Sequence, residues 1–184
     1  MGNFYTNVTI KGPSAAQVMQ VVKGLPCGTV YVLDLPGCVV IAEQGHGEEF
    51  LEQLTAKLDC SALGLGNADD STLFYDAFHA GNLVDKYCST PELLEEYEIS
   101  RNGNAQALCA AFGVSEASAR VDEILHRQKY TFEFERHFEL VKALGMPAAA
   151  LTTHFDDLHG VPPDDWPEEA TLRNCKRIEG KPVF

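Results

Sequence analysis

Long apolar runs, positive charge and catalytic signatures are all scarce in this sequence. No stretch approaches the roughly 18 consecutive apolar residues of a membrane-spanning helix. Residues 1–10 lack the basic region and apolar stretch of a secretory signal, so we expect a cytoplasmic protein. The 184 residues carry 14 Lys and Arg against 27 Asp and Glu, a formal net charge of −13. This balance disfavours nucleic acids and membranes as partners, because both attract positively charged surfaces.

The six cysteines contain no C-x-x-C pair, and several fall inside apolar runs. Cys38 precedes Val39-Val40-Ile41, and Cys109 is followed by Ala110-Ala111-Phe112. A free, buried cysteine behaves as a small apolar residue. We therefore expect reduced thiols rather than disulfides, as is usual in the cytosol.

Known catalytic and phosphate-binding motifs are also missing. The sequence has neither a G-x-S-x-G nucleophile elbow nor a Walker A loop. Gly64-Leu65-Gly66 resembles the start of a dinucleotide-binding loop but lacks the third glycine, and no helix is predicted after it. We therefore nominate no catalytic residue and expect no cofactor. Catalysis stays open, but a non-enzymatic role is favoured.

The first half of the chain, residues 1–88, predicts a β-rich fold. Residues 4–10 alternate between two faces, as a strand does, and Ser14 can cap a helix. The other predicted elements are a hairpin of strands 30–33 and 39–41 around Pro36-Gly37, a helix over 48–58, a short strand over 62–65, and a hairpin of strands 72–79 and 83–87 around Gly81-Asn82. The order β-α-β-β-α-β predicts a ferredoxin-like sheet, extended by a β-hairpin.

The second half changes character. Residues 89–145 predict helices, starting at Thr90-Pro91-Glu92, after the capping residue Asn104, and over 131–144, where Phe134, His137, Phe138 and Val141 share one face. Residues 146–184 are rich in proline and predict an irregular tail that wraps the body, with at most one strand over 148–153. With 45% hydrophobic and 22% charged residues, the chain suits one α+β domain over residues 1–184, with one shared core.

Several short motifs spread over about four-fifths of the chain support a resemblance. They are Phe4-Tyr5-Thr6-Asn7 with Lys11-Gly12-Pro13, Asp69-Asp70 and Tyr75 before Gly81-x-Leu83-Val84-Asp85-x-Tyr87, Gly103-Asn104-Ala105 with Leu108-Cys109-x-Ala111-Phe112-Gly113, and Arg136-His137 with Leu140 and Leu144-Gly145-x-Pro147. On these residues the chain resembles a group of uncharacterised bacterial proteins. The resemblance implies a shared fold and a bacterial origin, and it implies no activity.

Carboxylates and tyrosines gather in the predicted hairpin that ends the first half, and they form the first candidate site. Its members are Asp69, Asp70, Tyr75, Asp76, Asp85 and Tyr87. Clustered carboxylates beside aromatic side chains suit a basic protein surface, because opposite potentials steer encounter and tyrosine supplies contact area. The simpler interpretation is a solvated turn in which Asp69-Asp70 serve turn geometry.

The alternative sites use histidine or aromatic side chains. The segment His154-Phe155-Asp156-Asp157-Leu158-His159 is the only dense His/Asp group, so His154, Asp156, Asp157 and His159 form an alternative metal site. Its spacing matches no standard site, and we expect no metal as the first choice. A third possibility is a small-ligand pocket between sheet and helices, lined by Tyr31, Phe74 and Phe138. His137 is expected in the core, bonded to a backbone carbonyl.

Taken from sequence, the favoured function is a non-enzymatic, acidic protein-interaction module. The concrete version is an immunity or inhibitor protein that blocks the basic surface of a toxin. A metal-dependent enzyme and a small-ligand-binding protein remain alternatives, both using the region around His154–His159 or the aromatic pocket. The oligomeric state is left open.

Overall fold

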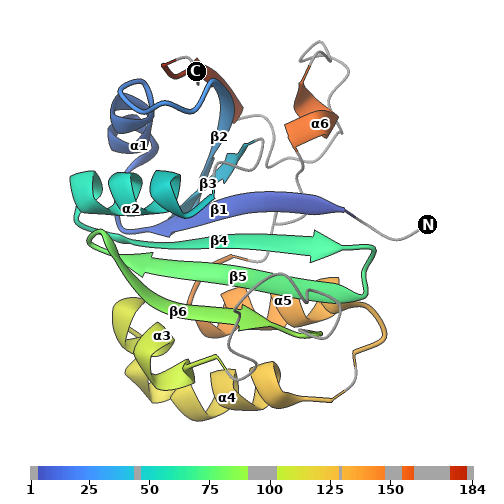
Figure 1. Cartoon of the computed structure of the whole chain (residues 1–184). Coiled ribbons are helices and arrows are strands. Elements are labelled where there is room, and N and C mark those ends of the chain that lie inside the picture. Colours follow the sequence, from blue (N-terminus) through green and yellow to red (C-terminus); the bar gives the residue numbers. More distant parts are fainter. Residues whose placement is uncertain are drawn as a thin grey trace.

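The computed structural model describes residues 4–43, 47–90, 103–128, 130–147, 155–159 and 175–181. Within these residues a seven-stranded sheet carries helices on both of its faces (Figure 1). The strands are β1 (Tyr5–Lys11), β2 (Thr29–Leu35), β3 (Cys38–Ala42), β4 (Ser61–Ala68), β5 (Thr72–His79), β6 (Asn82–Cys88) and β7 (Cys175–Glu179). The helices are α1 (Ala15–Val22), α2 (Gly47–Leu58), α3 (Ala105–Ala111), α4 (Ser118–His126), α5 (Glu133–Ala143) and α6 (Phe155–Leu158).

The strands follow the order β6-β5-β4-β1-β3-β2-β7, and every neighbouring pair is antiparallel. The α+β class and the two predicted hairpins, now β2–β3 and β5–β6, are therefore confirmed. Among the described residues, no helix has the length and apolar character needed to cross a membrane.

The sheet is larger than predicted, because part of the expected irregular tail forms β7. This strand pairs with β2, from Thr29 opposite Glu179 to Leu33 opposite Cys175. Its sequence, CKRIE, alternates only weakly, and its buried residues are Cys175 and Ile178, one in each apolar cluster. The prediction of an irregular tail was therefore wrong for this segment. The strand expected over 148–153 and the helix start at Thr90-Pro91-Glu92 lie wholly or largely outside the described residues.

The sheet divides the buried apolar side chains into two clusters, one on each face, and one of them holds residues from both halves of the chain. Alternation along β1 shows why: Val8 and Ile10 point to the side of α1 and α2, whereas Tyr5 points to the opposite side. The second cluster is covered by α3, α4, α5 and α6. Figure 1 shows α1 and α2 together on one side of the strands, with α3, α4 and α5 on the other.

Two of the predicted helix caps are confirmed, and one turn was misplaced. The hydroxyl of Ser14 and the side chain of Asn104 cap α1 and α3 as predicted. The β5–β6 hairpin, however, turns at Ala80-Gly81 instead of Gly81-Asn82. Both turn residues have positive φ, 48° and 82°, as a type I′ turn requires. Gly81 thus takes the second turn position, not the first.

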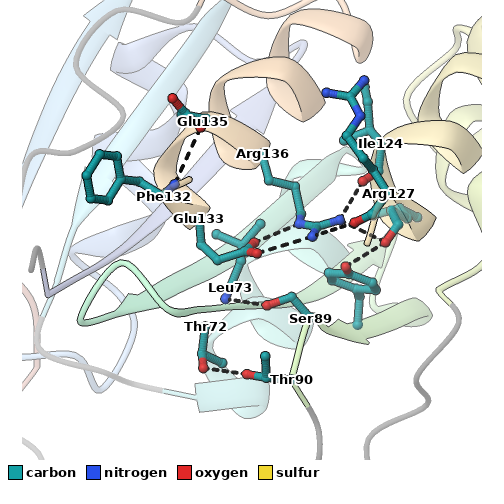
Figure 2. A network of polar contacts seen from close by, with 12 residues as sticks. Thr72, Leu73, Ser89, Thr90, Ile124, Arg127, Phe132, Glu133, Glu135 and Arg136 are labelled. Atoms are coloured by element: carbon teal, nitrogen blue, oxygen red, sulfur yellow. Dashed lines mark hydrogen bonds and ion pairs between the residues drawn. The ribbon is translucent and has the colours of Figure 1, made fainter. Parts of the chain in front are cut away.

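A buried arginine joins α4 to α5 (Figure 2). Arg136 forms an ion pair with Glu133, and it donates hydrogen bonds to the carbonyl oxygens of Ile124 and Leu125 at 2.6 and 2.9 Å. Arg136 and His137, with Leu140 and Val141, form the buried face of α5. The predicted face included Phe134 and Phe138, which are instead only half-buried.

Candidate functional site

Strand alternation separates the residues of the predicted acidic-aromatic hairpin. Tyr75, Asp85 and Tyr87 point toward the layer of α3, α4 and α5, and they are only 2%, 9% and 2% exposed. Asp76 points to the opposite face, beside α2. The two tyrosines therefore offer no contact area on the surface. Partner binding by this hairpin stays a prediction, and only its acidic residues outside the tyrosine layer are accessible to a partner.

The buried half of the hairpin has a structural task. The Tyr75 hydroxyl donates to the Asp85 carboxylate at 2.7 Å, and the rings of Tyr75 and Tyr87 stack with centroids 5.4 Å apart. Asp85 also accepts from the backbone N–H of Asn104. Burial raises the pKa of Asp85, and the bond from Tyr75 only partly offsets that rise. These contacts hold the start of α3 against the sheet.

Gly103 belongs to the same contact region. Its φ is +44°, and a Cβ at this position would lie 3.1 Å from the Tyr75 hydroxyl and 2.9 Å from Leu125. A side chain here would meet both the backbone strain of positive φ and this close packing. In the motif Gly103-Asn104-Ala105, Gly103 thus allows the backbone to turn with positive φ, and Asn104 caps α3.

Asp69 and Asp70 form the turn between β4 and β5, both with φ of +53°. The Asp70 backbone N–H donates to the Asn67 side chain at 3.1 Å. Its carbonyl oxygen accepts from the N–H of Glu133 at 2.9 Å, which links the turn to the start of α5. This geometry agrees with the simpler interpretation, in which both aspartates serve the turn.

Asp76 lies in an acidic group on the other face. Its carboxylate is 3.4 Å from the Lys86 ammonium, which also forms an ion pair with Glu48 at the start of α2. Burial raises the pKa of Asp76, while Lys86 acts in the opposite direction. Burial alone would lower the pKa of Lys86, but Glu48 and Asp76 together raise it. One ammonium thus serves two carboxylates.

A hollow of about 310 Å³ lies next to this group, between α2 and the strands. Its lining residues include Phe50, Phe74, Glu43 and Asp76. Glu43 is only 6% exposed. We call this space the Phe74 hollow. Sequence reasoning found Phe74 and Asp76 but not Glu43 or Phe50, which come from distant segments.

Two glycines of β4 shape the hollow. A Cβ on Gly66 would lie 2.2 Å from the Phe74 ring, and a Cβ on Gly64 would lie 2.5 Å from a methyl group of Leu51. The ring and the methyl group therefore rest directly on the strand backbone. The pattern Gly64-Leu65-Gly66, which only resembles a dinucleotide loop, thus makes room for side chains from β5 and α2.

The predicted metal site can be placed only in part. His154 and the side chains of Asp156 and Asp157 lie outside the described residues. The His159 ring is described, and it stacks on Phe155 with centroids 4.6 Å apart. The described part of the chain holds no group of three or more His, Cys, Asp or Glu side chains suited to a metal. Metal binding by this segment stays a prediction.

The three aromatic residues of the predicted ligand pocket do not face one another. Tyr31 and Phe138 pack in the cluster covered by α3, α4, α5 and α6. Phe74 faces α2 on the other side of the sheet. The sheet lies between Phe74 and the other two residues, so the prediction of a pocket lined by Tyr31, Phe74 and Phe138 was wrong.

A second groove, of about 470 Å³, was not predicted. It contains Ser61 and His79, whose Oγ and Nδ1 atoms lie 2.9 Å apart. The Ser61 hydroxyl donates its proton to the Ala111 carbonyl oxygen at 2.5 Å. Burial raises the pKa of the neighbouring Cys60 thiol to about 12, and Asp59 adds to the rise. The Ser61 hydroxyl therefore donates its hydrogen bond to a carbonyl oxygen and not to the His79 ring. The raised pKa of Cys60 disfavours the thiolate, which is the nucleophilic form of cysteine.

The comparisons with known proteins give no relative. No family model, no curated protein and no solved structure matches this chain.

Proposed function

We propose that this chain is a non-enzymatic, acidic protein-interaction module of the immunity or inhibitor type, which binds a basic partner. The observation that carries the proposal is the group of carboxylates around the Phe74 hollow. Glu48 and Asp76 share one ammonium, that of Lys86, and Glu43 lies in the wall of the hollow. We call Glu43, Glu48, Asp76 and the hollow the acidic corner.

The physical argument is that carboxylates and aromatic rings here border one depression. Opposite charge steers a basic partner toward such a surface, and the half-buried ring of Phe74 supplies apolar contact area. The sequence carries a net charge of −13, so the wider field of the chain also favours a basic partner. The partner-binding region proposed here is therefore the acidic corner and not the whole hairpin predicted from the sequence. Asp76 belongs to both regions.

The proposal extends to the organisation of the chain. We propose one cytoplasmic domain over residues 1–184, in which the first six elements form a ferredoxin-like βαββαβ unit. The neighbouring order β4-β1-β3-β2 with antiparallel pairs supports that unit. The hairpin β5–β6 and the strand β7 then extend its two edges.

The test is affinity capture from the source organism with the purified chain as bait, at low and moderate salt. We expect a basic protein that Glu48→Lys bait recovers at least tenfold less well. Glu116→Lys is the matched control, because Glu116 is also exposed and the substitution changes the net charge equally. Recovery of no protein at either salt, or equal loss with both variants, would contradict the proposal.

A further inference from the structure

We propose that this chain forms a symmetric dimer in which the β7 strands of two copies pair with each other. β7 ends the sheet on the side away from β6, and in the described part of the chain β2 is its one strand neighbour (Figure 1). An edge strand carries a row of backbone N–H and C=O groups that another strand can bind. The inference does not rest on the function proposed above, because the acidic corner lies around α2 and β5 rather than at β7.

The backbone groups of alternate residues of β7 point toward β2 and away from it. The N–H of Gly180, directly after β7, donates to the carbonyl oxygen of Gly28 at 2.6 Å, so the groups of Gly180 point toward the β2 side. In an antiparallel pair this direction alternates along each strand. Ile178 therefore shares the direction of Gly180, whereas Arg177 and Glu179 direct their N–H and C=O groups to the open side. A further strand would bind at these two residues.

The charges of the two outward residues select one register for the pairing. Arg177 and Glu179 lie on the same face of the sheet, where their side chains form an ion pair at 2.8 Å and are 58% and 60% exposed. Registers that place either residue opposite its own copy set like charges against each other, which destabilises a strand pair. The register between them places Arg177 of one copy opposite Glu179 of the other, and the two-fold symmetry forms this pair twice. It also keeps the same face of both sheets on the same side.

The other residues of β7 accept this register. Ile178 meets its own copy, and Lys176 meets Gly180, so no like charges face each other. Each Arg177–Glu179 pair exchanges two backbone hydrogen bonds between the copies. Ile178 is already only 9% exposed, so the pairing buries little new apolar area. The dimer is therefore weak and depends on backbone bonds and matched charges.

The wider electrostatic field also favours this edge. Residues 175–181 carry the basic side chains of Lys176, Arg177 and Lys181 and one carboxylate, that of Glu179. The whole chain has a net charge of −13, so β7 is a basic edge on an acidic protein. Each edge is thus attracted by the field of the other copy.

Charged residues on an edge strand also serve in many proteins to prevent association, and this is the competing explanation. That role is best filled by side chains of one sign, such as lysines, because like charges then face each other in every register. β7 instead carries opposite signs at its two outward positions, Arg177 and Glu179. This order of signs is the one that self-pairing requires.

The experiment is sedimentation equilibrium of the full chain over a range of protein concentrations. We expect a monomer–dimer equilibrium without larger species, because each chain contributes one β7 edge. Arg177→Glu and Glu179→Arg each set like charges against each other and should weaken the dimer at least tenfold. An equimolar mixture of the two variants restores opposite charges in both pairs, so it should form a mixed dimer about as strongly as the native chain does.

Lys176→Glu is the matched control, because it changes the net charge as Arg177→Glu does but faces Gly180 of the other copy. It should leave the dimer within about threefold of the native affinity, since an exposed charge without an opposite partner contributes little. Far-UV circular dichroism shows whether each variant is folded, and the mixture tests the pairing with both single variants present. A monomer at every concentration, growth beyond the dimer, equal weakening by Lys176→Glu, or no association in the mixture would overturn the inference.

Discussion

Both faces of the sheet pack apolar side chains against their helices, and the face of α3, α4 and α5 adds buried hydrogen bonds to helix ends. Toward α1 and α2 the contact is made mainly by apolar side chains such as Val18, Val22 and Leu54, all completely buried. Toward α3, α4 and α5, polar side chains reach the carbonyl oxygens at helix ends. Lys11 donates to Phe112 and Leu144, which end α3 and α5, and Tyr87 donates to Leu125 near the end of α4.

This difference follows from where the ends of the helices lie. The last four carbonyl groups of each helix have no hydrogen-bond donor within that helix. The ends of α3, α4 and α5 meet the sheet or one another, so side chains of the sheet and of α5 supply the donors. Both sides should therefore respond to loss of apolar volume, and the α3–α5 side should respond to loss of single donors as well.

The largest effect is expected at Arg136. Arg136→Met removes three donor contacts to the carbonyl groups of Ile124, Leu125 and Arg127. It also leaves Glu133, which is 8% exposed, without its buried cation. Breaking a buried pair in this way costs about 3–5 kcal/mol of unfolding free energy. Urea denaturation followed by circular dichroism measures it.

The double variant Glu133→Leu/Arg136→Met is the control for Arg136. Because it leaves no uncompensated charge, it should recover part of the lost stability. A loss below about 1 kcal/mol in the single variant would mean that this face, like the other, depends mainly on apolar burial.

The next largest effect on the free energy of unfolding is expected from low pH, through protonation of His137. Burial lowers the pKa of His137 to about 3, and its Nδ1 lies 2.7 Å from the Tyr5 hydroxyl. The unfolded chain protonates this ring below its ordinary pKa of about 6.5, but the folded chain does not. The stabilisation is therefore complete above about pH 6.5 and is lost as the pH falls toward 3, by about 1.4 kcal/mol per pH unit.

Unfolding free energies of the native chain and of His137→Phe between pH 7 and 4 test this expectation. The difference between the two curves should shrink steadily below pH 6.5, because the variant lacks the titrating ring. His126→Gln changes an exposed ring on α4 and should leave the slope unaltered. Parallel curves for the native chain and His137→Phe would show that the buried ring does not set the acid sensitivity.

Lys11 should give a smaller effect, since its ammonium is only partly buried. Lys11→Met removes the donors to Phe112 and Leu144, each at 2.9 Å, and should cost about 2 kcal/mol. Lys23→Met, at an exposed position after α1, should change stability by less than about 0.5 kcal/mol. Hydrogen exchange should rise at the last turns of α3 and α5. Equal exchange in both variants would show that water replaces the ammonium without loss.

The contrast between the faces also explains what the sequence could predict. Alternation and capping are local, so the strands up to residue 88 and the caps at Ser14 and Asn104 were predictable. The strand β7 depends on pairing with β2, more than a hundred residues away in the chain, and its own pattern is mostly charged. The alternation of side chains along a strand predicts that Tyr75 and Asp76 lie on opposite faces of the sheet. Which of the two faces is buried depends on the helices that cover it, and the strand pattern does not show this. The Phe74 hollow joins four segments, and no local pattern marks it.

The smallest expected effect concerns the β5–β6 turn, which packs on α2. The Gly81 N–H donates to the Thr55 hydroxyl at 3.0 Å, and Ala80 before it has φ of +48°. Asparagine tolerates positive φ better than alanine, so Ala80→Asn should stabilise the chain by about 0.5–1 kcal/mol. Ala80→Pro is the opposite control, because it excludes positive φ and removes the N–H that donates to the Cys60 carbonyl. Thermal unfolding should shift upward for the first variant and downward for the second; a decrease for Ala80→Asn would show that contact with α2, rather than backbone conformation, determines the residue at this turn.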